Sequence, residues 1–170
     1  MAKTSDVTRQ VYEAAAGCEA KKAEGVTVLE LDKAAGGFTD YFVICSGSNP
    51  RQIQAISDEV EQRLSRTGTR PAHVEGYQQA EWVLLDYVDF VVHVFSNRAR
   101  NFYNLERLWK SARQWRPEDL RRSIAKRAAR GTTPAAVAAQ AAKPRRVSQN
   151  LRAQSRRGSR GSSQPSSRRS

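Results

Sequence analysis

Apolar residues recur at three- and four-residue steps in three stretches of the chain, a pattern typical of helices with one buried face. The first predicted helix spans about residues 5–24, and Gly25 follows where a left-handed C-cap residue belongs. The second begins at Pro50, because Asn49 is a suitable N-cap residue and Gln52 completes a capping-box arrangement. Its apolar stripe consists of Ile53, Ile56, Val60 and Leu64.

A third helix is predicted from about residue 97 through Trp109 and on toward Trp115. Its expected packing face carries Phe102, Leu105, Leu108 and Trp109. Between the helices, β-branched and aromatic residues dominate shorter stretches that predict strands. These strands are, in chain order, 26–31, 40–46, 73–75, 82–87 and 90–95.

The resulting order, α-β-β-α-β-β-β-α, predicts an α/β fold with a mixed sheet of four or five strands flanked by helices. The stretch 40–46 is apolar on both faces and is therefore expected at the centre of the sheet. The last two strands form a hairpin whose turn, 86–89, contains Val88. Because Val disfavours a positive φ, a type I turn or a longer connection is expected there.

Charge divides the chain into a slightly acidic body and a basic tail. Residues 1–119 hold all 17 acidic residues and 15 of the 29 Lys and Arg, whereas 120–170 hold the other 14 basic residues and no acid. We therefore expect one domain over residues 1–118 and a disordered Ala-, Arg- and Ser-rich tail over 119–170. Clustered Arg in such a tail indicates phosphate contacts with RNA, and the alternative is a solubilising extension.

Trp82 is the first candidate for a binding residue. In a strand, Trp82, Leu84 and Asp86 share one face while Val83, Leu85 and Tyr87 share the other. Asp86 favours solvent near the end of the first face, which leaves Trp82 partly open. An exposed Trp beside carboxylates suits a protein-binding hot spot, and the alternative is a Trp that covers the edge of the sheet.

The remaining polar residues do not form a recognisable catalytic or metal site. Acidic side chains gather near strand ends at Asp40, Glu75, Glu81, Asp86 and Asp89, where they suit an acidic patch facing a basic partner, or solvated turns. His73 and His93 are isolated, and Cys18 and Cys45 suit buried free thiols. No metal, cofactor or catalytic residue is therefore expected. Ser46, Gly47 and Ser48 precede a helix and give a weak phosphate-binding signal.

Residues 1–10 contain no apolar run, and no stretch approaches the roughly 18 apolar residues of a membrane helix. We accordingly expect a cytoplasmic protein without a membrane partner.

The chain resembles the ribosomal silencing factor family, also called the Iojap family. Three blocks carry the resemblance: DYFVICSG (40–47) followed by Arg51 and Gln52; EGY (75–77) with EWVLLDY (81–87); and HVF (93–95) with FYNLERLW (102–109). They extend over about residues 5–115. One departure is Val88, where members of that family often have a small residue such as Gly.

The resemblance implies a nucleotidyltransferase-like fold without transferase activity. It also implies binding to large-subunit ribosomal protein fourteen, which sterically blocks the joining of the small and large subunits and lowers translation when nutrients are short. A homodimer of the free protein is expected as well. The implied partner-binding residues are Trp82, Leu84, Asp86 and Asp89, together with Tyr77, Glu81 and Tyr87.

Two other functions remain open at this point. A nucleotide-binding or nucleotidyltransferase-type enzyme on the same fold would need magnesium-bound carboxylates near Ser46–Ser48, and the next helix offers only the adjacent Asp58 and Glu59. A plain RNA-binding protein would act through its tail alone.

Overall fold

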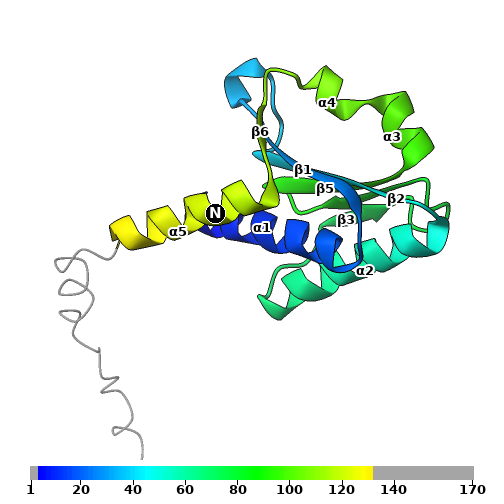
Figure 1. Cartoon of the computed structure of the whole chain (residues 1–170), viewed down its shortest axis with the longest axis horizontal. Helices are drawn as coiled ribbons and strands as arrows, with labels where there is room; N and C mark the ends of the chain where they lie inside the picture. The colour runs from blue at the N-terminus through cyan, green and yellow to red at the C-terminus, as the bar shows by residue number, and fades with distance from the viewer. Residues whose placement is uncertain (1–3, 132–170) are drawn as a thin grey trace, which may run out of the picture. The chain divides into compact units, whose positions relative to one another are not determined.

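The computed structural model describes residues 4–131 of the 170-residue chain. The expected α/β class is confirmed, and the mixed sheet has six strands rather than four or five. The part of the predicted tail from residue 132 on lies outside the described residues. The elements, labelled in Figure 1, are α1 (Thr4–Ala20), β1 (Glu24–Glu30), η1 (Lys33–Ala35), β2 (Tyr41–Gly47), α2 (Pro50–Arg66), β3 (His73–Glu75), β4 (Trp82–Asp86), β5 (Phe90–Ser96), α3 (Asn97–Tyr103), α4 (Leu105–Leu108), β6 (Arg113–Trp115) and α5 (Pro117–Gly131).

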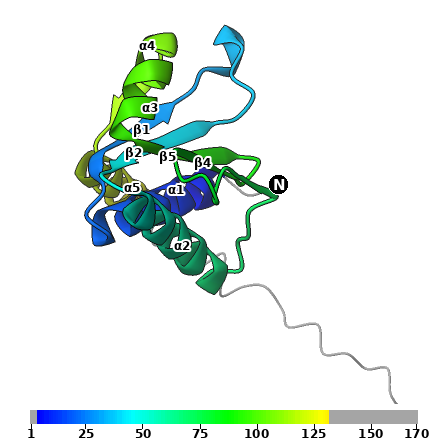
Figure 2. The same ribbon diagram turned by 90° about the vertical axis from the view of Figure 1, so that its right-hand side faces the viewer.

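The strands lie in the order β3-β4-β5-β2-β1-β6. The central pair, β2 and β5, is parallel, and all other neighbours are antiparallel. Every residue of β2 is buried, as expected for a strand covered on both faces. Helices α1, α2 and α5 lie on one side of the sheet, and α3 and α4 lie on the other (Figures 1 and 2). The two faces are therefore covered by very different amounts of helix.

The larger core lies between the sheet and the three long helices. The predicted stripe of α2 is fully buried there, and α1 adds small and branched side chains. The N-terminus of α2 is built as the sequence predicts, because Asn49 Oδ1 accepts a hydrogen bond from the Gln52 amide at 2.9 Å. Gln52 Oε1 accepts from the Ser48 amide at 2.7 Å, one residue before the N-cap amide that the predicted capping box would bond. Both cysteines are free and buried, as expected.

Helix α1 ends at Ala20, before its predicted end at residue 24. Lys22 adopts a φ of 58°, and the Ala23 amide donates to the Cys18 carbonyl at 3.0 Å, which closes the helix. Gly25 is therefore not the helix cap. It lies within β1 with a φ of 57°, and the Arg100 guanidinium packs so closely that a Cβ at this position would lie 2.8 Å from Nη1.

The predicted third helix is broken at Asn104, which has a left-handed φ of 41°. The Asn104 amide donates to the Arg100 carbonyl and ends α3, while Asn104 Oδ1 accepts from the Arg107 amide and begins α4. The expectation of one shared packing face is therefore wrong. Leu105 and Trp109 pack on the sheet, but the side chains of Phe102 and Leu108 are 80% and 72% exposed.

The hairpin between β4 and β5 closes through a γ-turn centred on Val88. The φ of Val88 is 72°, and the Asp89 amide donates to the Tyr87 carbonyl at 2.9 Å. The expected type I turn or longer connection is therefore wrong. A branched residue with this φ is strained, and neighbouring contacts hold it: Asp86 Oδ1 accepts from the Val88 amide, and Thr39 Oγ1 donates to the Val88 carbonyl.

The domain continues beyond residue 118, the end expected from the sequence. Strand β6 pairs antiparallel with the end of β1, and α5 follows it. Leu120 is buried in the larger core and Ile124 packs against it. Residues 119–131 are therefore helical, where the sequence predicted the beginning of a disordered tail.

Leu120→Ala should lower the free energy of unfolding by about 2–5 kcal/mol, because it leaves a cavity between α5 and the core. Urea denaturation measures this change. The exposed neighbour Arg121 provides the control, and Arg121→Ala should shift stability by no more than about 0.5 kcal/mol. Equal midpoints for the two variants would mean that α5 does not contribute to the core.

Val88→Gly should raise the free energy of unfolding by about 1 kcal/mol, since Gly adopts a positive φ without the steric cost of a branched side chain. The melting temperature reports the change. Val88→Ala keeps a Cβ and should gain less. If the Gly variant is no more stable than the Ala variant, the backbone strain at this turn is refuted.

Candidate functional site

The sparsely covered side of the sheet carries a continuous set of aromatic rings. We call it the Trp82 face, and its residues are Phe42, Trp82, Leu84, Asp86, His93, Phe95 and Tyr103. The Trp82 ring lies 4.5 Å from the Tyr103 ring and 5.1 Å from the Phe95 ring, centroid to centroid. Trp82, Leu84 and Asp86 are all partly exposed, whereas Val83 and Leu85 are fully buried on the opposite side. The predicted orientation of this strand is confirmed.

His93 fixes the orientation of Trp82. The indole Nε1 donates a hydrogen bond to His93 Nδ1 at 3.0 Å, so the neutral imidazole carries its proton on Nε2. The ring also meets the edge of Phe42 at a centroid distance of 4.7 Å. His93 Nε2 is buried and has no hydrogen-bond partner within residues 4–131. His93 is therefore hydrogen-bonded at only one of its two ring nitrogens.

Burial lowers the pKa of His93 from its usual 6.5 to about 4. The hydrogen bond to Trp82 agrees with this direction, because a proton on Nδ1 would face the indole N–H. His93 therefore stays neutral at physiological pH and serves as a fixed hydrogen-bond acceptor beneath Trp82.

Exposed apolar side chains surround the Trp82 face. Phe38 contacts Phe42 with centroids 5.7 Å apart, and its side chain is 74% exposed. On the helical side, Phe102 meets Tyr103 at 5.0 Å. Phe102, Tyr103 and Leu108 also line a depression of about 410 Å³. The sequence predicted Phe102 and Leu108 on a packing face, left Tyr103 open between the edge of the core and an interface, and did not single out Phe38.

Acidic residues gather at one end of the Trp82 face. Asp86 lies beside the γ-turn, and Asp40 and Asp89 lie next to each other, because the Asp40 amide donates to the Asp89 carbonyl at 2.9 Å. Lys33 pairs with Asp40 at 2.9 Å, which raises the pKa of Lys33. Glu75 lies on the neighbouring edge strand opposite Leu84. The opposite end of the Trp82 face is positively charged, because Arg107 and Lys110 line the depression beside Phe102.

Three of the expected partner-binding residues lie elsewhere. Tyr87 is buried in the larger core, where it stacks on Phe90, and burial raises its pKa. Tyr77 packs on that same side, and its hydroxyl donates to Asp58 at 3.0 Å. Glu81 lies at the opposite end of β4 and accepts from Ser96 Oγ at 2.7 Å, next to the start of α3. Neither tyrosine contributes to the Trp82 face.

The candidate phosphate turn is occupied by internal contacts. Gln52 Oε1 accepts hydrogen bonds from both the amide and the hydroxyl of Ser48. Ser46 is buried and its hydroxyl accepts from Arg100 at 3.1 Å. Glu59 is paired with Arg63 at 2.9 Å. Within the described part of the chain, no group of three or more His, Cys, Asp or Glu could hold a metal ion.

The fold and the site together define a mixed α/β domain with one sparsely covered, aromatic sheet face. The family model for ribosomal silencing factor during starvation matches residues 4–146. A ribosomal silencing factor from Bacillus subtilis is 41% identical over 99 residues, which cover 58% of this chain and 83% of the relative. Another, from Halalkalibacterium halodurans, is 45% identical over 92 residues, 54% of this chain and 78% of the relative.

Solved structures agree with these matches. A crystal structure of a protein from Chromobacterium violaceum has a TM-score of 0.57 at 28% identity, covering 64% of this chain and 88% of that one. The chain belongs to the ribosomal silencing factor family. The two relatives above are named as silencing factors and not as enzymes. No helix within residues 4–131 is both long and apolar enough to cross a bilayer.

Stability should fall as the pH drops from about 6.5 to about 4, because the unfolded chain then takes up a proton on His93 and the folded chain does not. The loss amounts to about 3 kcal/mol across this range. Urea midpoints measured at pH 7.5, 6, 5 and 4 test it.

His93→Asn can keep an acceptor for Trp82 and should remove most of this pH dependence. His73→Asn is the matched control, since His73 is exposed in the folded chain and its replacement should leave the dependence unchanged. A pH dependence that follows His73 instead of His93 would contradict this assignment.

Proposed function

We propose that the chain represses translation by docking the Trp82 face on a basic protein of the large ribosomal subunit. The family resemblance names large-subunit ribosomal protein fourteen as this partner. Bound there, the domain sterically prevents the small subunit from joining, especially when nutrients are limiting. The role is cytoplasmic and requires no reaction, metal or cofactor.

The observation that carries this proposal is the group of exposed apolar side chains at the margins of the Trp82 face. Soluble domains rarely leave several large apolar side chains open side by side unless a partner covers them. Here Phe38, Phe102 and Leu108 are each more than 70% exposed. Trp82 and Leu84 are partly open on the same face, and Trp82 is held in place by His93 and by contact with Tyr103. Aromatic residues held in this way supply most of the binding energy in protein interfaces.

Charge supports a basic partner. Asp86, Asp89 and Asp40 are close to one end of the face, and Glu75 extends the acidic surface along the edge strand. Opposite charges across an interface speed association and fix its orientation. Trp82, Leu84, Asp86 and Asp89 are the proposed anchors, and Glu81 lies at the margin.

Two further contacts belong to the proposal. The basic residues beyond the domain add a salt-sensitive contact with ribosomal RNA. The same apolar surface also lets two free copies pair, so a homodimer would compete with ribosome binding.

Trp82→Ala combined with Asp86→Ala should abolish cosedimentation with free large subunits. Loss of a central aromatic anchor costs at least about 2 kcal/mol, or roughly thirtyfold in affinity, and the charge loss adds to it. Sucrose-gradient sedimentation with purified subunits measures this. A double variant that still cosediments at the wild-type level would refute the assignment of the face.

Because Trp82 also packs within the domain, a second pair separates binding from folding. Phe102→Ala with Leu108→Ala removes only exposed side chains, so stability should hold while affinity falls at least tenfold. Val74→Ala is the control and should bind normally. Val74 is an exposed apolar residue of β3 whose side chain lies on the opposite face of the sheet from Trp82. Equal binding by the double variant and the Val74→Ala control would remove the support for this surface.

A further inference from the structure

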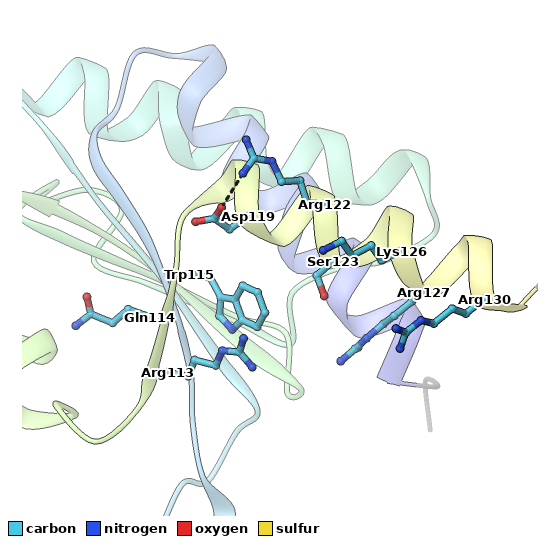
Figure 3. Close-up of a pocket in the computed structure, with 9 residues that line it drawn as sticks. All are labelled: Arg113, Gln114, Trp115, Asp119, Arg122, Ser123, Lys126, Arg127 and Arg130. Carbon is cyan, nitrogen blue, oxygen red and sulfur yellow. Dashed lines mark ion pairs between the residues drawn. The ribbon is translucent and has the colours of Figure 1, made fainter.

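A second hollow lies far from the Trp82 face, between β6 and α5. It has a volume of about 570 Å³, and its lining includes Arg113 and Trp115 of β6 and Lys126, Arg127 and Arg130 of α5. In Figure 3 the side chains of Arg113, Arg127 and Arg130 end on the same side of α5 as the Trp115 ring. The site therefore combines β6, which lies inside the domain expected from the sequence, with α5, most of which was assigned to the tail.

Positive charge dominates this hollow. Its only acidic lining residue, Asp119, is paired with Arg122 at 3.5 Å, and Figure 3 shows this pair on the other side of the helix. Arg113, Lys126, Arg127 and Arg130 form no ion pair with any described residue. Four unpaired cations around one space repel each other, and an anion bound between them relieves that repulsion. Guanidinium groups match phosphate oxygens in particular.

The hollow also contains a flat stacking surface. The Arg113 guanidinium carbon lies over the Trp115 ring, 3.9 Å from its centroid, which makes a cation–π pair. Trp115 Nε1 donates to Glu30 Oε2 at 2.8 Å, which fixes the ring in place. Nucleobases stack on aromatic rings and on Arg planes of this kind. Phosphate-binding cations next to a stacking surface are the two parts that a nucleotide needs.

We infer that this hollow binds single-stranded RNA, with a base on the Arg113–Trp115 pair and backbone phosphates on Lys126, Arg127 and Arg130. An extended strand fits better than a free nucleotide, because residues 132–170 continue from α5 with nine more Lys and Arg and no acidic residue. The hollow is distinct from the proposed docking face. Strand β6 is four strands away from β4, or about 19 Å across the sheet.

The test uses the full chain and a fluorescein-labelled twelve-residue oligouridylate, with binding followed by fluorescence anisotropy at several salt concentrations. Arg127→Glu with Arg130→Glu should weaken binding at least tenfold at 150 mM salt. The plot of log affinity against log salt concentration should become shallower by about 1.4, since each phosphate contact in a single strand contributes about 0.7. Arg51→Glu with Arg70→Glu makes the same charge change at exposed positions elsewhere and is the control.

Arg113→Lys keeps the charge and loses the planar stack. It should weaken oligouridylate binding several-fold and leave inorganic polyphosphate binding unchanged. The inference is overturned if both Glu pairs weaken RNA binding equally, because attraction would then be general. It is also overturned if Arg113→Lys affects RNA and polyphosphate alike. Cosedimentation of the Arg127→Glu, Arg130→Glu chain with large subunits at high salt, where contacts with RNA phosphates are weakened, reports the docking face separately.

Discussion

The left-handed conformation of Asn104 determines what this domain can offer to a partner. An unbroken helix from residue 97 to 109 would place Phe102, Leu105, Leu108 and Trp109 on one packing face. The break at Asn104 instead turns Leu105 and Trp109 toward the sheet and leaves Phe102 and Leu108 in solvent. The apolar area that a longer helix would bury is therefore available to another protein.

The rest of the domain makes this exposure tolerable. The larger core lies on the other side of the sheet, under α1, α2 and α5, and the Trp82 face has a smaller buried core of its own beneath the exposed side chains. Beneath the surface, the neutral His93 accepts from Trp82 and fixes the indole in one orientation. A binding surface whose aromatic anchor is already ordered loses less conformational entropy on association. The Trp82 face thus has exposed apolar side chains at its margins and an ordered indole at its centre.

The parts that the sequence predicted correctly are those set by local chemistry. The cap at Asn49 and the buried stripe of α2 depend on residues within one helix, and the alternation along β4 depends on one strand. The positive φ of Val88 is held by a contact with Thr39 of another segment, which no local pattern reports. The positive φ of Asn104 is held by local bonds to Arg100 and Arg107, and Asn is one of the residues that tolerate it, so this break had a local signal. Helix α5 carries few large apolar residues besides Leu120 and many charged ones. Its sequence therefore resembles a disordered basic tail more than a packed helix. Pro117 at its start, followed by Glu118 and Asp119, was the signal that could have revealed it.

The most direct test of the account is photocrosslinking of the chain to free large ribosomal subunits. A benzoylphenylalanine residue introduced in place of Leu108, on the open face, is compared with one in place of Gln62, which is exposed on α2. The account predicts a crosslink from position 108 to one basic large-subunit protein and none from position 62. Crosslinks of equal yield from both positions, or from position 62 alone, would contradict it.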